Sequence, residues 1–180
     1  AWGPLLTVPI EAGPATEAAK SGSVVLSEIM YHPSGASDSE KHAGHLNPDA
    51  FEFIELLNVS HQPVDLSGCR FSKGIDYQFS QGAQLRAGER LVLAKDRGAF
   101  EQRYGSKSRL VGLFRGGLKD SGETITLLAS DGTIIDRVAY QDKNPWPKSA
   151  DGKGASLILK PSGKDWQASP SRGGSPGQAD

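Results

Sequence analysis

The sequence has one cysteine, one methionine and few aromatic residues, which make up 7% of the chain. Cys69 has no partner for an intramolecular disulfide and leaves no cysteine cluster for zinc. No apolar run approaches the roughly 20 residues that a membrane-spanning helix needs. Twenty basic and 21 acidic residues give a formal net charge of −1. The chain as a whole therefore has no electrostatic field that would attract nucleic acid or an anionic membrane.

Glycine and proline are abundant, with 22 and 11 residues, and they separate short β-branched and aliphatic runs. This spacing is typical of an antiparallel β-sandwich. It predicts nine strands, at residues 24–31, 51–58, 70–72, 75–79, 89–94, 110–114, 124–128, 133–140 and 156–159. One short helix is expected at 96–104, between the N-cap candidate Asp96 and Gly105. The sequence thus predicts an all-β sandwich with a single short helix.

The two ends of the chain differ in composition from its middle. Residues 1–23 contain three prolines and a run of small residues, which predicts a linker or N-terminal extension. Residues 167–180 are rich in Ser, Pro and Gly, which predicts a flexible tail. The folded domain is therefore expected at 24–166. Its predicted core comprises Ile54, Leu56, Leu91, Leu93, Ile125, Leu127, Val138 and Leu157.

Several strings in this domain occur in the order found in bacterial lamin-tail domains. They cover residues 24–33, 51–58, 64–68, 85–94, 118–127 and 152–157, together with Ile135-Asp136 and Trp146-Pro147. The chain resembles this family, and the resemblance implies an immunoglobulin-like sandwich. It also implies an accessory position in a large exported or cell-surface bacterial protein, and in nuclear lamins the same domain mediates binding. Fold alone does not fix function.

Two features depart from the family pattern. Cys69 stands where an aromatic residue often follows the Asp-Leu-Ser-Gly turn, and we expect it to be a small buried residue. The segment 34–49 is long and rich in histidine and acids. We interpret this segment as a solvated loop. The alternative is a metal-dependent hydrolase that uses His42 and His45, with Asp49 and Glu52 as further weak ligand candidates.

Charged residues are unevenly distributed along the chain. Residues 28–65 carry a net charge of −6, and residues 86–119 carry +6. The two blocks either form solvated faces, meet each other across the fold, or present a polyanion-binding patch in which Arg97 and Arg103 are the contact residues. Glu28, Glu52 and Glu55 in the acidic block could serve acid–base chemistry or hold Ca²⁺, or could be exposed charges at strand ends.

Trp146 stands between two prolines in the loop Asn144-Pro145-Trp146-Pro147. It either packs over the end of the core or presents an aromatic platform to a ligand. Neither a nucleophile elbow nor a phosphate-binding loop occurs in the sequence. We therefore predict an interaction module without a catalytic site or cofactor. Its expected partners are other domains of the parent protein or another macromolecule, in an extracellular or cell-surface setting.

Overall fold

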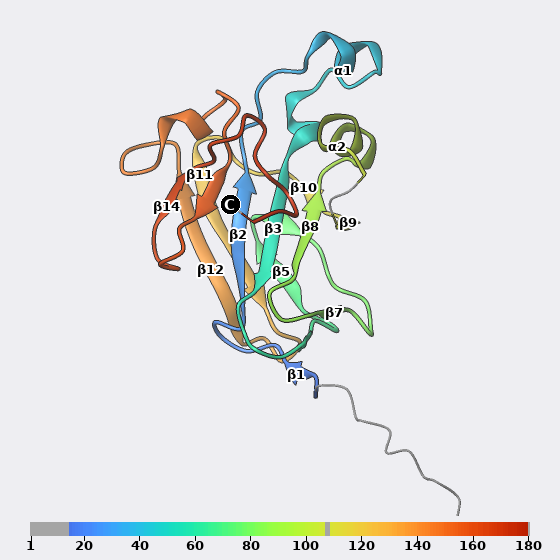
Figure 1. Ribbon diagram of the computed structural model, residues 1–180, viewed down its shortest axis with the longest axis vertical. Helices are drawn as coiled ribbons and strands as arrows, with labels where there is room; N and C mark the ends of the chain where they lie inside the picture. The colour runs from blue at the N-terminus through green and yellow to red at the C-terminus, as the bar shows by residue number, and fades with distance from the viewer. Residues whose placement is uncertain (1–14, 107–108, 180) are drawn as a thin grey trace, which may run out of the picture.

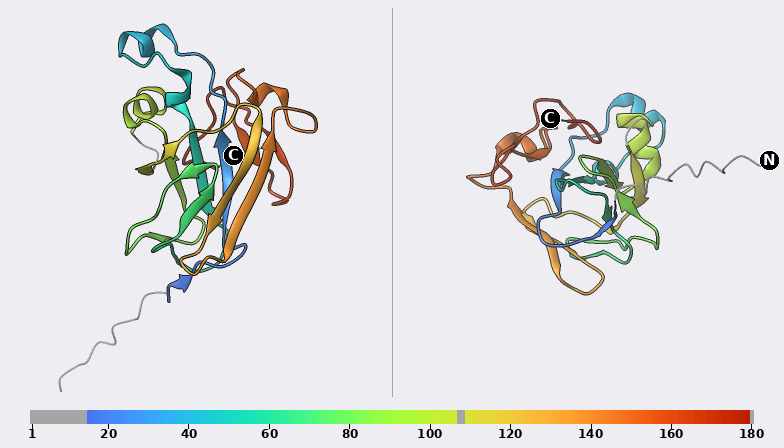
Figure 2. Two further views of the ribbon diagram at one scale, coloured as in Figure 1. Left: turned by 180° about the vertical axis from the view of Figure 1, so that it is seen from behind. Right: turned by 60° about the horizontal axis from the view of Figure 1, so that its bottom comes forward.

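The computed structural model describes residues 15–106 and 109–179, whose two main β-sheets pack face to face, with two small sheets beside them (Figures 1 and 2). The larger sheet has the strand order β14 (Trp166–Ala168), β13 (Leu157–Leu159), β2 (Val24–Met30), β3 (Phe53–Asn58), β8 (Arg90–Ala94) and β9 (Leu110–Leu113). The smaller sheet has the order β12 (Ile134–Gln141), β11 (Gly122–Leu128) and β5 (Arg70–Lys73). The predicted two-layer sandwich is confirmed.

All nine predicted strands are present, and the structure adds five strands of only two or three residues in its described part. One of these is β14. The others are β1 (Glu17–Ala18), β4 (Val64–Asp65), β7 (Gln84–Leu85) and β10 (Arg115–Gly116), the last of which pairs with β6 (Ile75–Asp76). Strands this short have no measurable alternation in sequence. Two pairings, β8 with β9 and β1 with β4, are parallel, which the antiparallel prediction did not include.

The predicted helix is confirmed as α2 (Arg97–Tyr104), with the Asp96 side chain accepting a hydrogen bond from the Ala99 amide. A second helix, α1 (Asp38–His42), lies where a loop was predicted. Ser37 and Glu40 form a capping box at its start, which satisfies two backbone N–H groups reciprocally. The Ser-x-x-Glu pattern was visible in the sequence. Two 3₁₀ turns, η1 (Pro48–Phe51) and η2 (Lys148–Ala150), complete the helical elements of the described residues.

The main core lies between the two sheets. All eight predicted core residues are buried, with Val138 the most exposed at 8%. Cys69 is also buried, as expected. Strand β2 contributes Leu26 and Ile29 to this core although they are three residues apart. A β-bulge between Leu26 and Glu28 reverses the alternation and makes this possible.

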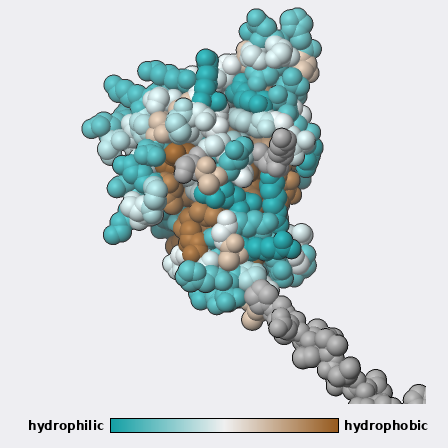
Figure 3. Space-filling model, in the orientation of Figure 1, coloured by the Kyte–Doolittle hydropathy of each residue, from teal (hydrophilic) through white to brown (hydrophobic). Residues whose placement is uncertain are grey.

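The outward face of the larger sheet is covered over its upper half (Figure 1). Phe100 and Tyr104 of α2 pack there on Phe53 and Val92, in a second apolar cluster. Both faces of β8 are therefore buried, which explains why Leu91, Val92, Leu93 and Ala94 form an unbroken apolar run. Lower on the same face, hydrophobic residues remain at the surface (Figure 3).

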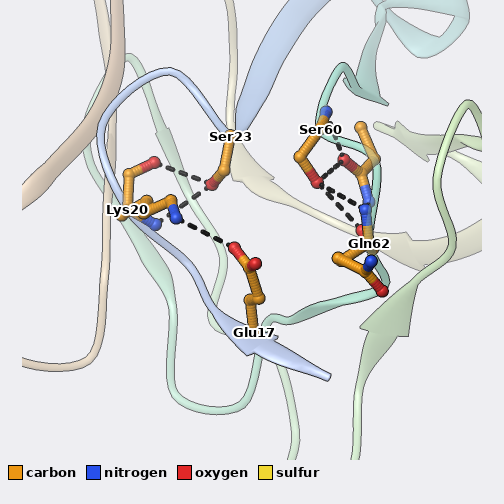
Figure 4. A network of polar contacts seen from close by, with 6 residues as sticks. Glu17, Lys20, Ser23, Ser60 and Gln62 are labelled. Atoms are coloured by element: carbon orange, nitrogen blue, oxygen red, sulfur yellow. Dashed lines mark hydrogen bonds and ion pairs between the residues drawn. The ribbon is translucent and has the colours of Figure 1, made fainter. Parts of the chain in front are cut away.

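The chain before Val24 is attached to the sandwich from Glu17 onward. Strand β1 pairs with β4, and the Glu17 amide donates to the Pro63 carbonyl. A polar network beside it includes the Lys20–Glu17 ion pair at 2.9 Å and a hydrogen bond from the Ser23 hydroxyl to the Lys20 carbonyl (Figure 4). The predicted linker 1–23 thus includes residues that pair with the domain, while residues 1–14 lie outside the described part of the chain.

The C-terminal segment also contacts the domain beyond Trp166, where the sequence predicts its end. Strand β14 continues to Ala168. Farther along, the Ser175 amide donates to Glu28 at 2.9 Å and the Gly177 amide donates to Glu55 at 2.6 Å. These bonds run to carboxylates that no sequence pattern links to the tail.

Candidate binding surface

Two tryptophans and two lysines line an open cleft beside β14, at one edge of the larger sheet. Trp146 lies in the loop after β12, and Trp166 begins β14. Their ring centroids are 6.2 Å apart and the ring planes are tilted by 38°. The cleft has a volume of about 420 Å³ and is lined by Pro145, Trp146, Lys160, Lys164, Asp165 and Trp166. We call it the tryptophan cleft.

Local hydrogen bonds fix the two segments that build this cleft. The β13–β14 hairpin closes where the Lys160 amide donates to the Asp165 carbonyl at 2.8 Å. Gly163, at φ 69°, supplies the left-handed backbone that this tight turn requires. On the other side, the Trp146 amide donates to the Lys143 carbonyl at 2.9 Å. Both indoles are only partly buried against the core, so packing holds them while part of each ring stays accessible.

The cleft lies in a locally basic part of the chain. Residues 142–165, which include the lining residue Asp165, contain five lysines and three aspartates, a net charge of +2. None of these lysines has an ion-pair partner among the described residues. Four of them are exposed, and Lys160 is half-buried beside the indoles. Their ammonium groups are therefore available to a ligand from solvent.

Part of the basic block at 86–119 is neutralised by the acidic block. Three of its cations reach acids of residues 28–65: Arg90 pairs with Glu55 at 3.1 Å, Lys95 with Glu52 at 3.6 Å and Arg103 with Glu40 at 2.7 Å. For these three cations, the interpretation that the two blocks meet across the fold therefore applies. Lys107 lies outside the described residues.

The two weak contact candidates of this block are placed differently. The Arg103 guanidinium lies 3.5 Å from the centroid of the Phe51 ring, and its side chain is only 11% exposed. Arg97 is exposed and pairs with Glu101 on the same helix. The structure therefore does not bring Arg97 and Arg103 together into one surface, and it places both away from the residues that line the tryptophan cleft.

Glu28, Glu52 and Glu55 are buried, so the interpretation as exposed strand-end charges is wrong. Glu28 and Glu55 face each other in register across β2 and β3. Ser156 donates to Glu28, and Ser27 and Arg90 donate to Glu55. Together with the amides of the C-terminal segment, these donors stabilise the charges inside the protein. The carboxylates therefore serve the fold rather than an open site.

Glu52 is the exception because burial outweighs its partners. The Leu118 amide and Lys95 stabilise its charge, but desolvation raises its pKa to about 7. Its proton is then held more tightly in the native state than in the unfolded chain, where the pKa is 4.5. The contribution of Glu52 to stability is therefore largest below about pH 4.5 and declines as the pH rises towards 7.

Glu52→Gln is accordingly expected to raise the free energy of unfolding at pH 8 by about 2 kcal/mol, with little effect near pH 4. Urea denaturation of both proteins between pH 4 and 8 measures the difference. Glu123→Gln, which removes a half-buried carboxylate that contacts the Lys119 amide, is the matched control. A difference between wild type and Glu52→Gln that stays constant with pH would contradict the raised pKa.

His42 and His45 do not converge on a common point. The His42 ring nitrogen Nδ1 lies 2.6 Å from the Asp38 carbonyl within α1, and the His45 ring packs edge-on against Phe51. Asp49 lies in η1, and Glu52 is turned inward to Lys95. Within residues 15–106 and 109–179, no three His, Cys, Asp or Glu side chains form a group that could hold a metal ion. The geometry gives no support to a hydrolase centred on this segment.

Sequence reasoning identified Trp146 but missed its neighbours. Trp166, Lys160 and Lys164 follow or flank the last predicted strand, in a part of the sequence interpreted as the end of the domain. The turn Lys160-Pro-Ser-Gly-Lys164 between an aliphatic run and Trp166 was a hairpin signal. Its position beside Trp146 depends on tertiary pairing.

Comparison with known proteins gives one match. The family model of the lamin tail domain matches residues 17–142, whereas a comparison with curated proteins finds no match. None of the helices in the described part of the chain combines the length and apolar character needed to cross a membrane. The matched region contains the strands from β1 to β12, and the tryptophan cleft lies beyond it. Because the match covers more than half of the 180 residues, the chain belongs to the lamin tail domain family.

Proposed function

We propose that this domain is a non-catalytic binding module of a larger exported or cell-surface protein, and that it contacts its ligand through the tryptophan cleft. One observation carries the proposal: two partly exposed indoles, 6.2 Å apart, line an open cleft together with two lysines that have no ion-pair partner among the described residues. Tryptophan is among the residues that contribute most to binding energy when a partner buries it.

The state of the other charged groups supports a binding role. Glu28 and Glu55, which face each other as a catalytic pair would, accept hydrogen bonds from Ser156, Ser27 and Arg90 and lie beneath the C-terminal segment. A substrate would have to displace that segment to reach them. The arginines Arg90 and Arg103 are likewise engaged by buried glutamates. The tryptophan cleft, in contrast, combines two partly exposed indoles with two lysines that have no ion-pair partner among the described residues.

The cleft lies outside the region that matches the family model, which favours a ligand that is particular to this chain. The sandwich then serves as a rigid support, and the 145–146 loop and the β13–β14 hairpin at its edge carry recognition. The exported setting is favoured by the sequence resemblance to bacterial lamin-tail domains. Such a module would position its parent protein on a macromolecular surface.

Calorimetric titration against four probes tests the proposal: tetragalacturonic acid, cellotetraose, heparin and a short oligothymidylate. We expect at least one probe to bind, and Trp146→Ala to weaken that binding at least about tenfold. Leu46→Ala, which removes a 71% exposed apolar side chain from a distant loop, is the control and should bind as wild type does. Binding that survives Trp146→Ala unchanged, or no binding of any probe, would overturn the tryptophan cleft as the contact surface.

A further inference from the structure

We propose that the ligand of the tryptophan cleft is an acidic glycan, a chain of sugar rings that carry carboxylates. This inference rests on the proposed binding function and adds the chemical class of the ligand. It follows from the arrangement of the two rings, from the polar groups between them and from the charge around the cleft.

The arrangement of the indoles fits a ligand that lies across them. A flat base inserted between two rings needs about 3.5 Å to each of them and parallel planes. Trp146 and Trp166 are 6.2 Å apart and inclined by 38°, so the space between them is too narrow and too oblique for an inserted base. Sugar rings have apolar C–H faces, which lose contact with water when they lie on an indole. A sugar ring can therefore rest on the part of an indole that stays accessible, without entering the space between the two rings.

The polar lining of the cleft combines donors with an acceptor. Lys160 and Lys164 donate, and the Asp165 carboxylate accepts. Sugar hydroxyls can satisfy both kinds of group because they donate to a carboxylate and accept from an ammonium. A phosphodiester has no donor for Asp165, whereas an acidic glycan carries hydroxyls that can donate to it. The volume of about 420 Å³ lies within the range of small-molecule sites.

The surrounding charge favours an acidic glycan over a neutral one. Residues 142–165 carry a net charge of +2, and their lysines have no ion pairs among the described residues. Carboxylates on a sugar chain would interact with Lys160 and Lys164 while the ring faces contact the indoles. Such contacts between exposed charges weaken as salt increases.

The experiment compares tetragalacturonic acid with cellotetraose, which has the same number of rings and no carboxylate, and with oligothymidylate. We expect tetragalacturonic acid to bind at least about tenfold more tightly than the other two at 50 mM salt, and less tightly at 150 mM salt. Trp146→Ala and Trp166→Phe should each weaken its binding; the second variant retains apolar packing on the core. Thermal melting checks that both variants remain folded.

A pair of charge variants separates specific contact from general attraction. Lys164→Gln removes a cation that lines the cleft, and Lys153→Gln removes an exposed cation from the same basic segment outside that lining. Lys164→Gln should weaken binding severalfold and reduce its salt dependence, and Lys153→Gln should have a smaller effect. Neither lysine has an ion pair in the described structure, so folding should be unaffected.

The outcomes distinguish the glycan assignment from the binding function. Equal affinity for cellotetraose would overturn the acidic character of the ligand. Tighter, Trp146-dependent binding of oligothymidylate would overturn the glycan assignment and leave the binding module intact. Equal effects of Lys164→Gln and Lys153→Gln would also count against the glycan assignment, because they would show attraction without contact in the cleft.

Discussion

Arg90→Met is expected to lower the free energy of unfolding by about 3 to 5 kcal/mol. The Arg90 guanidinium nitrogen Nε lies 3.1 Å from the Glu55 carboxylate, which is fully buried in the centre of the larger sheet. Arg90 itself is 21% exposed. Removing it leaves the buried carboxylate without this cation, and neither Ser27 nor the Gly177 amide, which also donate to it, carries a charge. Urea denaturation at pH 7 measures the loss.

Two further variants test whether the loss of stability comes from the buried charge of Glu55. Arg97→Met breaks the exposed pair with Glu101 on α2 and should cost no more than about 0.5 kcal/mol. The double variant Arg90→Met/Glu55→Gln removes both charges and should be more stable than Arg90→Met alone, because the Glu55 charge is no longer buried without its cation. If Arg90→Met and Arg97→Met had equal effects, Glu55 would not depend on its cation.

The position of the Arg90–Glu55 pair shows what could be predicted from the sequence and what could not. Alternation in 53–58 placed Ile54 and Leu56 on the core side, and both are buried there. The same alternation placed Glu55 on the opposite face, and an outward face is normally solvated. Here α2 and the C-terminal segment cover that face, so Glu55 is buried. Coverage by distant segments leaves no periodic signal within a strand.

Charge matching between distant segments is equally hard to predict. The opposite blocks at 28–65 and 86–119 indicated that they could meet, and three ion pairs join them. Which residues pair depends on strand register and on the turn of α2 that directs Arg103 to Glu40. The sequence therefore indicated that the two blocks could form ion pairs, and the structure identifies the residues that do so.

The tryptophan cleft illustrates the same limit for a site. The two prolines around Trp146 indicated a stiff loop in which the indole either packs on the core or is presented to a ligand. In the structure, one part of the indole packs on the core and another part lines the cleft. The second ring comes from a strand of three residues, too short to recognise by alternation. Only the pairing of β13 with β2 and with β14 brings Lys160, Lys164 and Trp166 to the Trp146 loop.

Leu127→Ala is expected to lower the free energy of unfolding by about 3 kcal/mol. Leu127 lies in β11, the central strand of the smaller sheet, opposite Phe71 of β5 and Asp136 of β12, and it is fully buried in the core between the sheets. Its truncation leaves a cavity in this interface. Both sheets are held by β-pairing on either side and cannot move together to fill it, so the loss includes the cost of the cavity as well as of the lost apolar burial.

The matched control is Leu46→Ala, the same chemical change at a side chain that is 71% exposed beside α1. It should alter the free energy of unfolding by less than about 0.5 kcal/mol. Urea denaturation of the two variants and the wild type, fitted with a common dependence of the unfolding free energy on urea concentration, measures both values. A loss for Leu127→Ala as small as that for Leu46→Ala would mean that this face of β11 does not pack against the larger sheet. The face of β11 that forms the core of the sandwich would then have been identified wrongly.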